Sequence, residues 1–255
     1  MLIVIPTLGK RLPYLEETLA SIRAQEVPSD IVLVAPEGDP ALTRLAHEWD
    51  ALLIPDPGGL AAAINSGVAA GLREHQFVTW LNDDDRLCAG SLTASTSALS
   101  RHVEAVVAFG ACRYIDGRGR QLWISRAGAW APRILSWGPD LIPQPGMLIR
   151  TSAWQRVGGL DESYRLAFDL DLLLRLRRLG QFVNVKQVVS EFRWHPDSLT
   201  VDGRETNIAE SERARRSALG PTARKCVWMW ERPVRIATRY AAGQLNRRAS
   251  RLGAE

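Results

Sequence analysis

The sequence predicts an α/β protein with a mostly parallel, Rossmann-like sheet that carries helices on both faces, followed by a helical C-terminal tail. Three observations lead to this prediction. Short apolar runs alternate with helical patterns through the first hundred residues. An acidic segment, NDDD, directly follows the fourth run, and charged, helix-forming sequence occupies the chain after about residue 202.

The first half predicts four strands joined by helices. Four apolar runs have strand length: 2–5, 30–34, 51–54 and 77–81. Three stretches between them have helical spacing: 15–25, 41–49 and 60–72. This alternation implies right-handed crossovers and parallel strands, and ligands bind beyond the carboxyl ends of such strands. The acidic segment follows the fourth strand, so it lies where a ligand is expected.

The pattern changes after Val103, in a half that we expect to add a pocket wall. Residues 103–116 and 120–125 predict a strand pair joined at DGRG, and a loop rich in Trp, Pro and Gly extends to QPG at 144–146. A short helix is expected from Thr151, as its N-cap, to Gly158-Gly159. An amphipathic helix is expected within 160–180, and one or two closing strands within 182–195.

The composition is typical of a soluble globular protein, with 46% hydrophobic and 24% charged residues and a net charge of +4. Cys88, Cys112 and Cys226 are scattered and form no CxxC pair, which argues against a disulfide framework or a zinc knuckle. A reducing, cytoplasmic setting fits this pattern. The N-terminal apolar run is too short for a signal peptide, and no stretch has the length needed to span a bilayer.

Asp83, Asp84 and Asp85 are consecutive, and adjacent carboxylates repel one another unless a cation, strong donors or water stabilise them. A hard cation such as Mg²⁺ or Mn²⁺ is typically held by one or two carboxylates together with phosphate oxygens. The segment therefore predicts half of a metal site, whose other ligands would come from a diphosphate. The alternative is a solvated turn in which an aspartate caps the helix expected over 91–99.

Five motifs in the first 200 residues, taken in order, carry a resemblance to a known family. They are VIPTLGKRLPYLEETLASIRAQ, PGGLAAAINSGVAAG, WLNDDDRL, GGLDESYRLAFDLDLLLRL and FRWHPDSLT. Together they resemble the family-2 inverting glycosyltransferases of the GT-A fold. The resemblance implies hexosyl or deoxyhexosyl transfer from a nucleotide-diphosphate sugar to a hydroxyl group, with Mg²⁺ or Mn²⁺ on the diphosphate.

The resemblance also divides the chain. It implies a GT-A domain over 1–202, with a nucleotide-binding half (1–100) and an acceptor-binding half (101–202). A basic helical extension then covers 203–255.

The family's acidic metal motif matches Asn82-Asp83-Asp84. The resemblance implies that Asp84 binds the metal and that Asp83 lies near the ribose of the donor. Asn82 replaces an aspartate that is frequent in the family, but its amide oxygen still accepts a hydrogen bond from a ribose hydroxyl. Asp85 either orients Asp84 or caps a helix. His195 either joins the metal or the diphosphate, or is a structural histidine.

The family's Glu-Asp-x-Asp-Leu pattern falls on residues 168–172, with Phe168 in place of the glutamate. The resemblance implies that Asp169 is the base that takes the proton of the acceptor hydroxyl. Asp171, two positions further along a helix start, faces differently and is expected to complement the helix dipole.

The donor nucleotide is expected at the ends of the first strands. The resemblance places the base at Pro6 and Thr7, and Arg11 is close enough to reach a phosphate or ring oxygen. Asn65 lies in a run of small residues that lets main-chain amides approach a ligand. The family's acidic motif after the second strand is absent, which leaves Glu37 or Asp39 as substitutes. UDP-sugars are therefore only weakly preferred over thymidine or guanosine donors.

The acceptor is expected in the loop before QPG, where Trp130, Trp137 and Gln144 are the candidate contacts. A glycan or a lipid-linked acceptor fits such a site. Two rival functions are a nucleotidyltransferase and a non-catalytic carbohydrate-binding relative. PTLGKRLP is a poor match to the Gly-rich, basic loop of the first, and a degenerate relative should have lost Asp84 or Asp169.

The C-terminal segment 221–251 combines many Lys and Arg residues with Trp228, Trp230 and aliphatic residues, and Glu231 is its only acid. This composition predicts an interfacial helix at the inner face of a membrane, or an apolar face packed on the catalytic domain or on a second subunit. Nucleic acid is not expected as a partner, because the aromatics do not follow a known nucleic-acid-binding fold.

Overall fold

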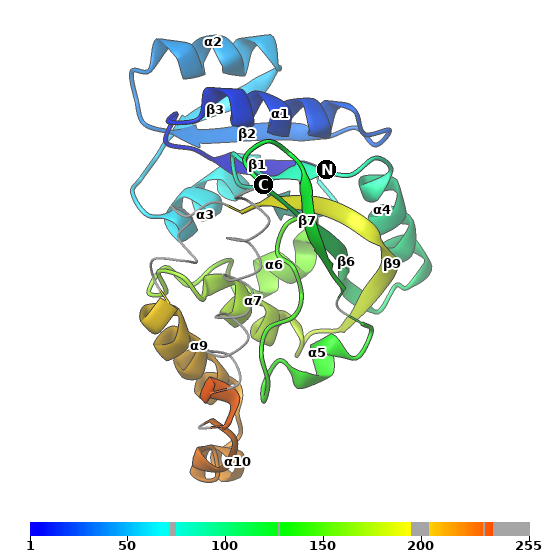
Figure 1. Ribbon diagram of the computed structural model, residues 1–255, viewed down its shortest axis with the longest axis vertical. Helices are drawn as coiled ribbons and strands as arrows, with labels where there is room; N and C mark the ends of the chain where they lie inside the picture. Colours follow the sequence, from blue (N-terminus) through cyan, green and yellow to red (C-terminus); the bar gives the residue numbers. More distant parts are fainter. Residues whose placement is uncertain (72–74, 127, 195–203, 232, 237–255) are drawn as a thin grey trace.

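The computed structural model describes residues 1–71, 75–126, 128–194, 204–231 and 233–236 (Figure 1). The strands are β1 (Leu2–Pro6), β2 (Asp30–Ala35), β3 (Ala51–Pro55), β4 (Phe77–Trp80), β5 (Arg86–Leu87), β6 (Ala105–Ile115), β7 (Gln121–Ser125), β8 (Leu148–Arg150) and β9 (Gln181–Arg193). The helices are α1 (Leu12–Arg23), α2 (Pro40–Glu48), α3 (Leu60–Gly71), α4 (Ser91–Arg101), α5 (Ala131–Ile134), α6 (Thr151–Val157), α7 (Phe168–Leu176), α9 (Arg204–Ala218) and α10 (Pro221–Lys225).

The strands form a mixed sheet in the order β3-β2-β1-β4-β8-β6-β9-β5, with β7 paired to β6. The four strands predicted from the first half are confirmed, and they form the continuous parallel run β3-β2-β1-β4. β8 runs antiparallel to both β4 and β6, while β9 runs parallel to β6. The predicted strand pair is the antiparallel pair of β6 and β7, and the closing strands are one long strand, β9.

Helices cover both faces of the sheet, as predicted. Successive side chains of β1 point to opposite faces, and the apolar side chains on each face are buried by helices. Leu2 and Val4 pack into the cluster that includes α3, α6 and α7, whereas Ile3 and Ile5 pack with α1, α2 and α4. Figure 1 shows α1 and α2 on one side of the parallel strands and α3, α6 and α7 on the other. Each buried aliphatic side chain of this kind stabilises the fold by about 1.5–3 kcal/mol.

Helix α3 lies unusually close to β1, because small residues face the strand. A Cβ atom on Gly67 would come within 2.4 Å of Val4 Cγ1, so only glycine permits this approach. The start of α3 follows the carboxyl end of β3. It therefore lies at the same edge of the sheet as the acidic segment after β4.

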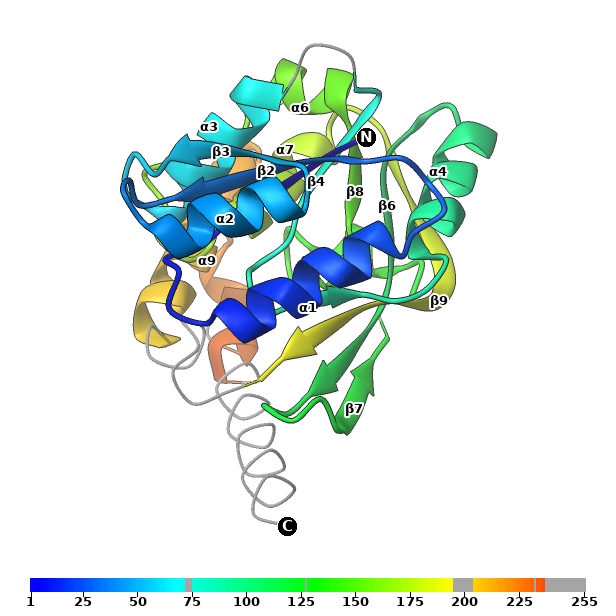
Figure 2. The ribbon, with the colours of Figure 1, turned by 90° about the horizontal axis from the view of Figure 1, so that it is seen from above.

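The second half places its helices as predicted, with two differences at their ends. Thr151 is the first residue of α6 and not its cap, since the capping position is Arg150 and no side-chain cap bond forms. Gly158, at a φ of 76°, ends the helix as expected. Helix α7 is shorter than the 160–180 pattern suggested. Helix α4 packs against β6 and β9 (Figure 2).

The first helix of the C-terminal tail, α9, packs on α7. The Glu210 carboxylate accepts hydrogen bonds from three consecutive main-chain amides that lead into α7, those of residues 165, 166 and 167. Ala214 and Leu219 are buried. Within the described part of the chain, no helix is both long enough and apolar enough to cross a membrane.

Candidate functional site

The acidic segment lies where the strand order of the sheet reverses. From β1 the chain proceeds to β2 and β3 on one side, and then returns to place β4 on the other side of β1. The carboxyl ends of β1 and β4 therefore flank the reversal point, where open α/β sheets form the crevice that binds their ligands. Thr7 follows β1 and Asp83 follows β4, so both predicted residues lie at this reversal point.

A hydrogen bond joins the two strand ends directly. Thr7 Oγ1 donates to Asp83 Oδ2 at 2.5 Å and accepts from the Gly9 amide at 3.0 Å. Burial raises the pKa of Asp83, and the Thr7 bond partly opposes this rise. Gly9 itself has a φ of 71°, which lets the chain turn tightly after β1. The predicted donor residue Thr7 thus fixes one carboxylate of the acidic segment.

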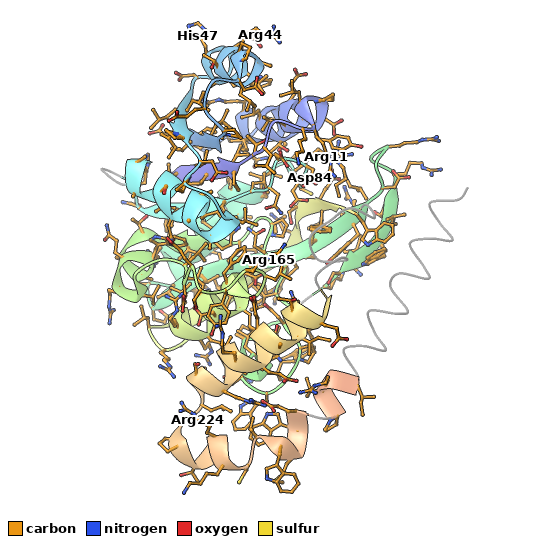
Figure 3. The ribbon with its side chains drawn as sticks, turned by 90° about the vertical axis from the view of Figure 1, so that its left-hand side faces the viewer. Arg11, Arg44, His47, Asp84, Arg165 and Arg224 are labelled. Carbon is orange, nitrogen blue, oxygen red and sulfur yellow. The ribbon has the colours of Figure 1, made fainter. Side chains whose placement is uncertain are left out.

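A basic side chain meets the second carboxylate. Arg11 Nη1 lies 3.2 Å from Asp84 Oδ2, and both side chains retain some exposure (Figure 3). Such a partly exposed pair contributes at most about 1 kcal/mol to stability. The pair matters for the site because it holds a carboxylate and a guanidinium side by side, and these groups have the charges that suit a cation and an anion.

Asp85 does not cap a helix, which corrects one of the two roles expected for it. Helix α4 starts after Gly90 and has no side-chain cap, because the short strand β5 intervenes. Asp85 is fully buried: Oδ2 accepts from Asn82 Nδ2 at 3.0 Å and Oδ1 accepts from the Arg193 amide at 3.0 Å. Burial, followed by the charge of Asp84, raises its pKa. Asp85 therefore fastens the acidic segment to β9.

Arg193, which the sequence reasoning missed, makes further contacts between β9 and the acidic segment. Its side chain is only 1% exposed and stacks on the Tyr14 ring at 4.1 Å. Nε donates to the Asp84 carbonyl at 3.1 Å, and Nη1 donates to the Gly117 carbonyl at 3.2 Å. Nη2 pairs with Glu17. The only signal in the sequence was an arginine inside the closing strand of the FRWH motif.

Asp83 and Asp84 form a donor set that suits a hard divalent cation only in part. In a Mg²⁺ or Mn²⁺ site that phosphate oxygens complete, the protein typically supplies one or two carboxylates, and this adjacent pair matches that number. Among the residues that the structure describes, no group of three or more His, Cys, Asp or Glu side chains is arranged to hold a metal. The predicted ligand His195 lies outside the described residues.

The other predicted donor residues differ in their surroundings. Pro6 is buried at the end of β1, and Glu37 is exposed in the turn after β2. Asp39, the other expected substitute, caps α2 by accepting from the Ala41 amide at 2.8 Å. Asn65 is bonded through both amide atoms to residue 160, and Nδ2 also donates to Glu162 at 2.9 Å. It holds the loop that leads towards α7.

Asp169, the predicted base, lies in the first turn of α7. Burial raises its pKa to about 6, and Oδ1 accepts a hydrogen bond from the Leu170 amide at 2.7 Å. Asp140, a residue that the sequence reasoning missed, is close enough to interact with it. Burial and then the charge of Asp169 raise the pKa of Asp140 to about 7. Asp171 instead pairs with Arg175 within the helix, at 2.7 Å.

The predicted acceptor residues lie in different surroundings. Gln144 Nε2 donates to the Trp80 carbonyl at 3.0 Å, which ties the loop before QPG to the end of β4. Trp137 packs against Trp230 of the C-terminal segment, with ring centroids 4.6 Å apart. Trp130 is 52% exposed at the start of α5. The loop thus links the crevice at β4 with the C-terminal helices.

Comparison with known proteins identifies solved structures of similar fold. S. aureus TarS residues 1–349 in complex with UDP-GlcNAc superpose with a TM-score of 0.65 at 14% identity, over 89% of this chain and 69% of that one. The mannosyltransferase PcManGT from Pyrobaculum calidifontis, in complex with GDP-Man and Mn²⁺, gives a TM-score of 0.61 at 15% identity, over 99% and 74%. No protein-family model and no curated protein matches this chain.

Identities this low show the fold alone. The expected GT-A-type fold is confirmed, since this chain superposes on these glycosyltransferase structures with TM-scores of 0.65 and 0.61.

Proposed function

We propose that this protein is an inverting glycosyltransferase that moves a sugar from a nucleotide-diphosphate donor to an acceptor hydroxyl. One observation carries the proposal. The Asp83-Asp84 pair lies beside Thr7 and Arg11 at the reversal point of a sheet whose fold is shared with structures bound to UDP-GlcNAc and GDP-Man. A crevice with two carboxylates and a guanidinium matches a donor that carries a diphosphate and its counter-ion.

In this proposal the donor occupies the ends of β1 and β4. Pro6, Thr7 and Glu37 face the base, Asn82 and Asp83 face the ribose, and Arg11 reaches a phosphate. Asp84, with or without His195, binds Mg²⁺ or Mn²⁺, and the PcManGT complex with Mn²⁺ supports metal use. The cation would neutralise the charge that develops on the leaving diphosphate. TarS bound to UDP-GlcNAc agrees with the weak preference for UDP-sugars, whereas PcManGT carries GDP-Man.

Asp169 acts as the base of the transfer. Its carboxylate takes the proton of the acceptor hydroxyl while that oxygen bonds to the anomeric carbon. The bond from this carbon to the diphosphate oxygen breaks on the opposite face, which inverts the anomeric configuration. A pKa of about 6 suits this role, because a base works best when its pKa lies near the working pH.

Asn65 supports the base from a distance. Its two amide atoms hold residue 160, and the loop from residue 160 leads to α7 and Asp169. We assign it to positioning of this loop and not to direct contact with the nucleotide.

We further propose that the acceptor is a glycan or a lipid-linked sugar, and that the enzyme works in the cytoplasm at the inner face of a membrane. Trp228 and Met229 are 67% and 60% exposed, within five residues of the basic pair Arg224 and Lys225, and Ile236 is 68% exposed. Exposed aromatic and aliphatic groups next to positive charge favour the surface of anionic lipid.

A thermal-shift screen of nucleotide sugars, with and without Mn²⁺, tests the proposed function. A donor present at about 100 times its Kd should stabilise the fold by about 2.7 kcal/mol. For a protein of this size that raises the Tm by about 5–10 °C. We expect one nucleotide class to do so in the presence of metal. If no nucleotide diphosphate or nucleotide sugar shifts the Tm, the proposal is wrong.

A further inference from the structure

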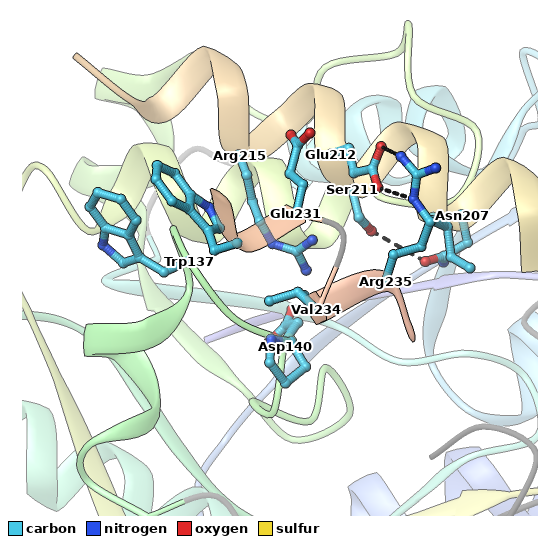
Figure 4. Close-up of a pocket in the computed structure, with 12 residues that line it drawn as sticks. Trp137, Asp140, Asn207, Ser211, Glu212, Arg215, Glu231, Val234 and Arg235 are labelled. Atoms are coloured by element: carbon cyan, nitrogen blue, oxygen red, sulfur yellow. Dashed lines mark hydrogen bonds and ion pairs between the residues drawn. The ribbon is translucent and has the colours of Figure 1, made fainter. Parts of the chain in front are cut away.

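A cavity of about 150 Å³ lies between the loop before QPG and the C-terminal helices. The loop supplies Trp137 and Asp140, α9 supplies Arg215, and the following segment supplies Trp230 (Figure 4). We call it the Trp137–Trp230 pocket. At about 30 Å³ per water it has room for about five waters, which is the scale of one small polar ring and not of a nucleotide.

Ion pairs build the wall that the C-terminal segment contributes. Arg235 pairs with Glu212 of α9 at 2.6 Å, and Arg216 of α9 pairs with Glu231. These pairs join Glu231 and Arg235 to α9, which itself packs on α7. The pocket is therefore formed by residues far apart in the sequence and held by specific contacts.

One side of the pocket is aromatic. The indoles of Trp137 and Trp230 lie with their centroids 4.6 Å apart and their planes at 60°, and Trp137 remains 44% exposed. Indole faces bind the C–H faces of a sugar ring, while the ring's hydroxyl groups stay available for hydrogen bonds.

The other side is polar and incompletely bonded. Arg215 Nε is buried and has no hydrogen-bond partner within the described part of the chain. Figure 4 shows the guanidinium extending into the pocket towards Asp140. Asp140 Oδ1 accepts from the Ile142 amide at 2.9 Å. The charges of Arg215 and Asp140 interact with each other, but an apolar ligand would leave Arg215 Nε without an acceptor. The hydroxyl groups of a sugar can accept from Nε and donate to Asp140.

We propose that the Trp137–Trp230 pocket binds one sugar ring of the acceptor, so that the C-terminal helices form part of the acceptor site. This inference rests on the proposed function. The pocket adjoins the predicted base, since Asp140 lines the pocket and also interacts with the charge of Asp169. A ring bound there would bring a hydroxyl group towards Asp169, while the donor occupies the crevice at β4.

The test uses the full chain, a panel of methyl glycosides of common hexoses and N-acetylhexosamines, and saturation-transfer NMR to measure binding. Trp230→Ala removes the aromatic side, and Arg215→Met removes the polar side with little change in volume. Trp228→Ala is the matched control, because Trp228 lies two residues before Trp230 and is 67% exposed outside the pocket.

We expect at least one glycoside to bind the wild-type protein and Trp228→Ala equally. Its affinity should fall about tenfold or more in both Trp230→Ala and Arg215→Met, while the donor-induced Tm shift stays the same in all four proteins. A loss of affinity in Arg215→Met as well shows that the loss in Trp230→Ala does not come from local misfolding alone. The inference is overturned if no glycoside binds the wild-type protein, or if both pocket variants bind as the control does.

If the proposed function is wrong but the pocket does bind a sugar, the measurements give a different result. In that case no nucleotide sugar shifts the Tm of the wild-type protein, yet glycoside binding still depends on Trp230 and Arg215. That outcome supports the pocket as a sugar site and removes only the transferase assignment.

Discussion

Replacing Arg193 with methionine should weaken both the fold and donor binding, because Arg193 holds the main chain of the proposed metal ligand. Its side chain is 1% exposed, and Nε donates to the carbonyl of Asp84 at 3.1 Å. Methionine keeps most of the volume but donates no hydrogen bond. The Asp84 carbonyl and the Gly117 carbonyl, 3.2 Å from Nη1, would then lose a charged donor.

The expected cost follows from these contacts. Each of the two bonds to carbonyl oxygens comes from a charged group and contributes about 1.5–3 kcal/mol. The ion pair with Glu17 adds under about 1 kcal/mol, since Glu17 is 42% exposed. We therefore expect a loss of about 4 kcal/mol in the free energy of unfolding. For a chain of this length that lowers the Tm by roughly 8–16 °C.

Arg150 provides a matched control far from the acidic segment. It too donates to main-chain carbonyls, at 2.7 Å to Ala105 and 2.6 Å to Leu99, and it lies over the Phe77 ring at 5.7 Å. Arg150→Met should lose a similar amount of stability. The two variants therefore separate a general loss of stability from a specific effect on the acidic segment.

The assay is donor binding, measured well below the Tm of each variant, as the apparent Kd of the nucleotide sugar in Mn²⁺. We expect the Kd to rise about tenfold in Arg193→Met and to stay unchanged in Arg150→Met, with partial recovery in Arg193→Lys. Equal donor affinity in the two methionine variants would refute the reasoning, because Arg193 would then act on stability alone.

Three further predictions concern the base, the metal ligand and the C-terminal segment. The transfer rate should rise with pH to a midpoint near 6, where Asp169 loses its proton, and stay level above it; Asp140→Asn should leave this midpoint near 6, because Asp140, with a pKa of about 7, is still mostly protonated there, and a midpoint well below 6 in that variant would contradict this order of ionisation. Asp84→Asn should abolish metal-dependent transfer and donor hydrolysis without lowering the Tm by more than a few degrees, and activity that survives in excess EDTA would remove the metal role. Co-sedimentation with anionic liposomes should occur at low salt, decline at high salt and weaken in Trp228→Ala, whereas binding that ignores both salt and Trp228 would argue against the membrane proposal.

The stability of the fold should also depend on pH through the same carboxyl pair, and the sign is fixed by their raised pKa values. Asp169 and Asp140 have folded-state pKa values of about 6 and 7, against an ordinary value of 3.8. Between these values the folded state binds more protons than the unfolded state. The free energy of unfolding should therefore fall as the pH rises from about 4 to 7, and chemical denaturation at several pH values should show a smaller fall in Asp140→Asn.

The parallel part of the sheet was predictable because its signals are local. The runs at 2–5, 30–34, 51–54 and 77–81 are apolar and bounded by helical patterns, and the structure places strands at all four. The position of the acidic segment followed from this, since it directly succeeds the fourth strand. Thr7 and Arg11 could be placed nearby for the same reason, as both lie within five residues of the end of the first strand.

The rest of the site depends on pairing between distant segments, which no local pattern encodes. Arg193 reaches Asp84 only because β9 pairs with β5 at the far side of the acidic segment. Asp140 was hidden in a Pro- and Gly-rich loop, and its neighbours come from α7 and α9. Asp85 was assigned as a possible helix cap because no sequence pattern indicated β5 between it and α4.

The proposed transfer is tested most directly by measuring nucleotide diphosphate release from a panel of nucleotide sugars, with Mn²⁺ and the panel of methyl glycosides present as acceptors, in the wild-type protein and in Asp169→Asn. We predict that the wild-type protein releases the diphosphate from one nucleotide class. Asp169→Asn should bind the same donor with unchanged affinity, but its rate of diphosphate release should be lower by about 10²-fold or more. No release from any donor by the wild-type protein, or equal release by the two proteins, would contradict the account.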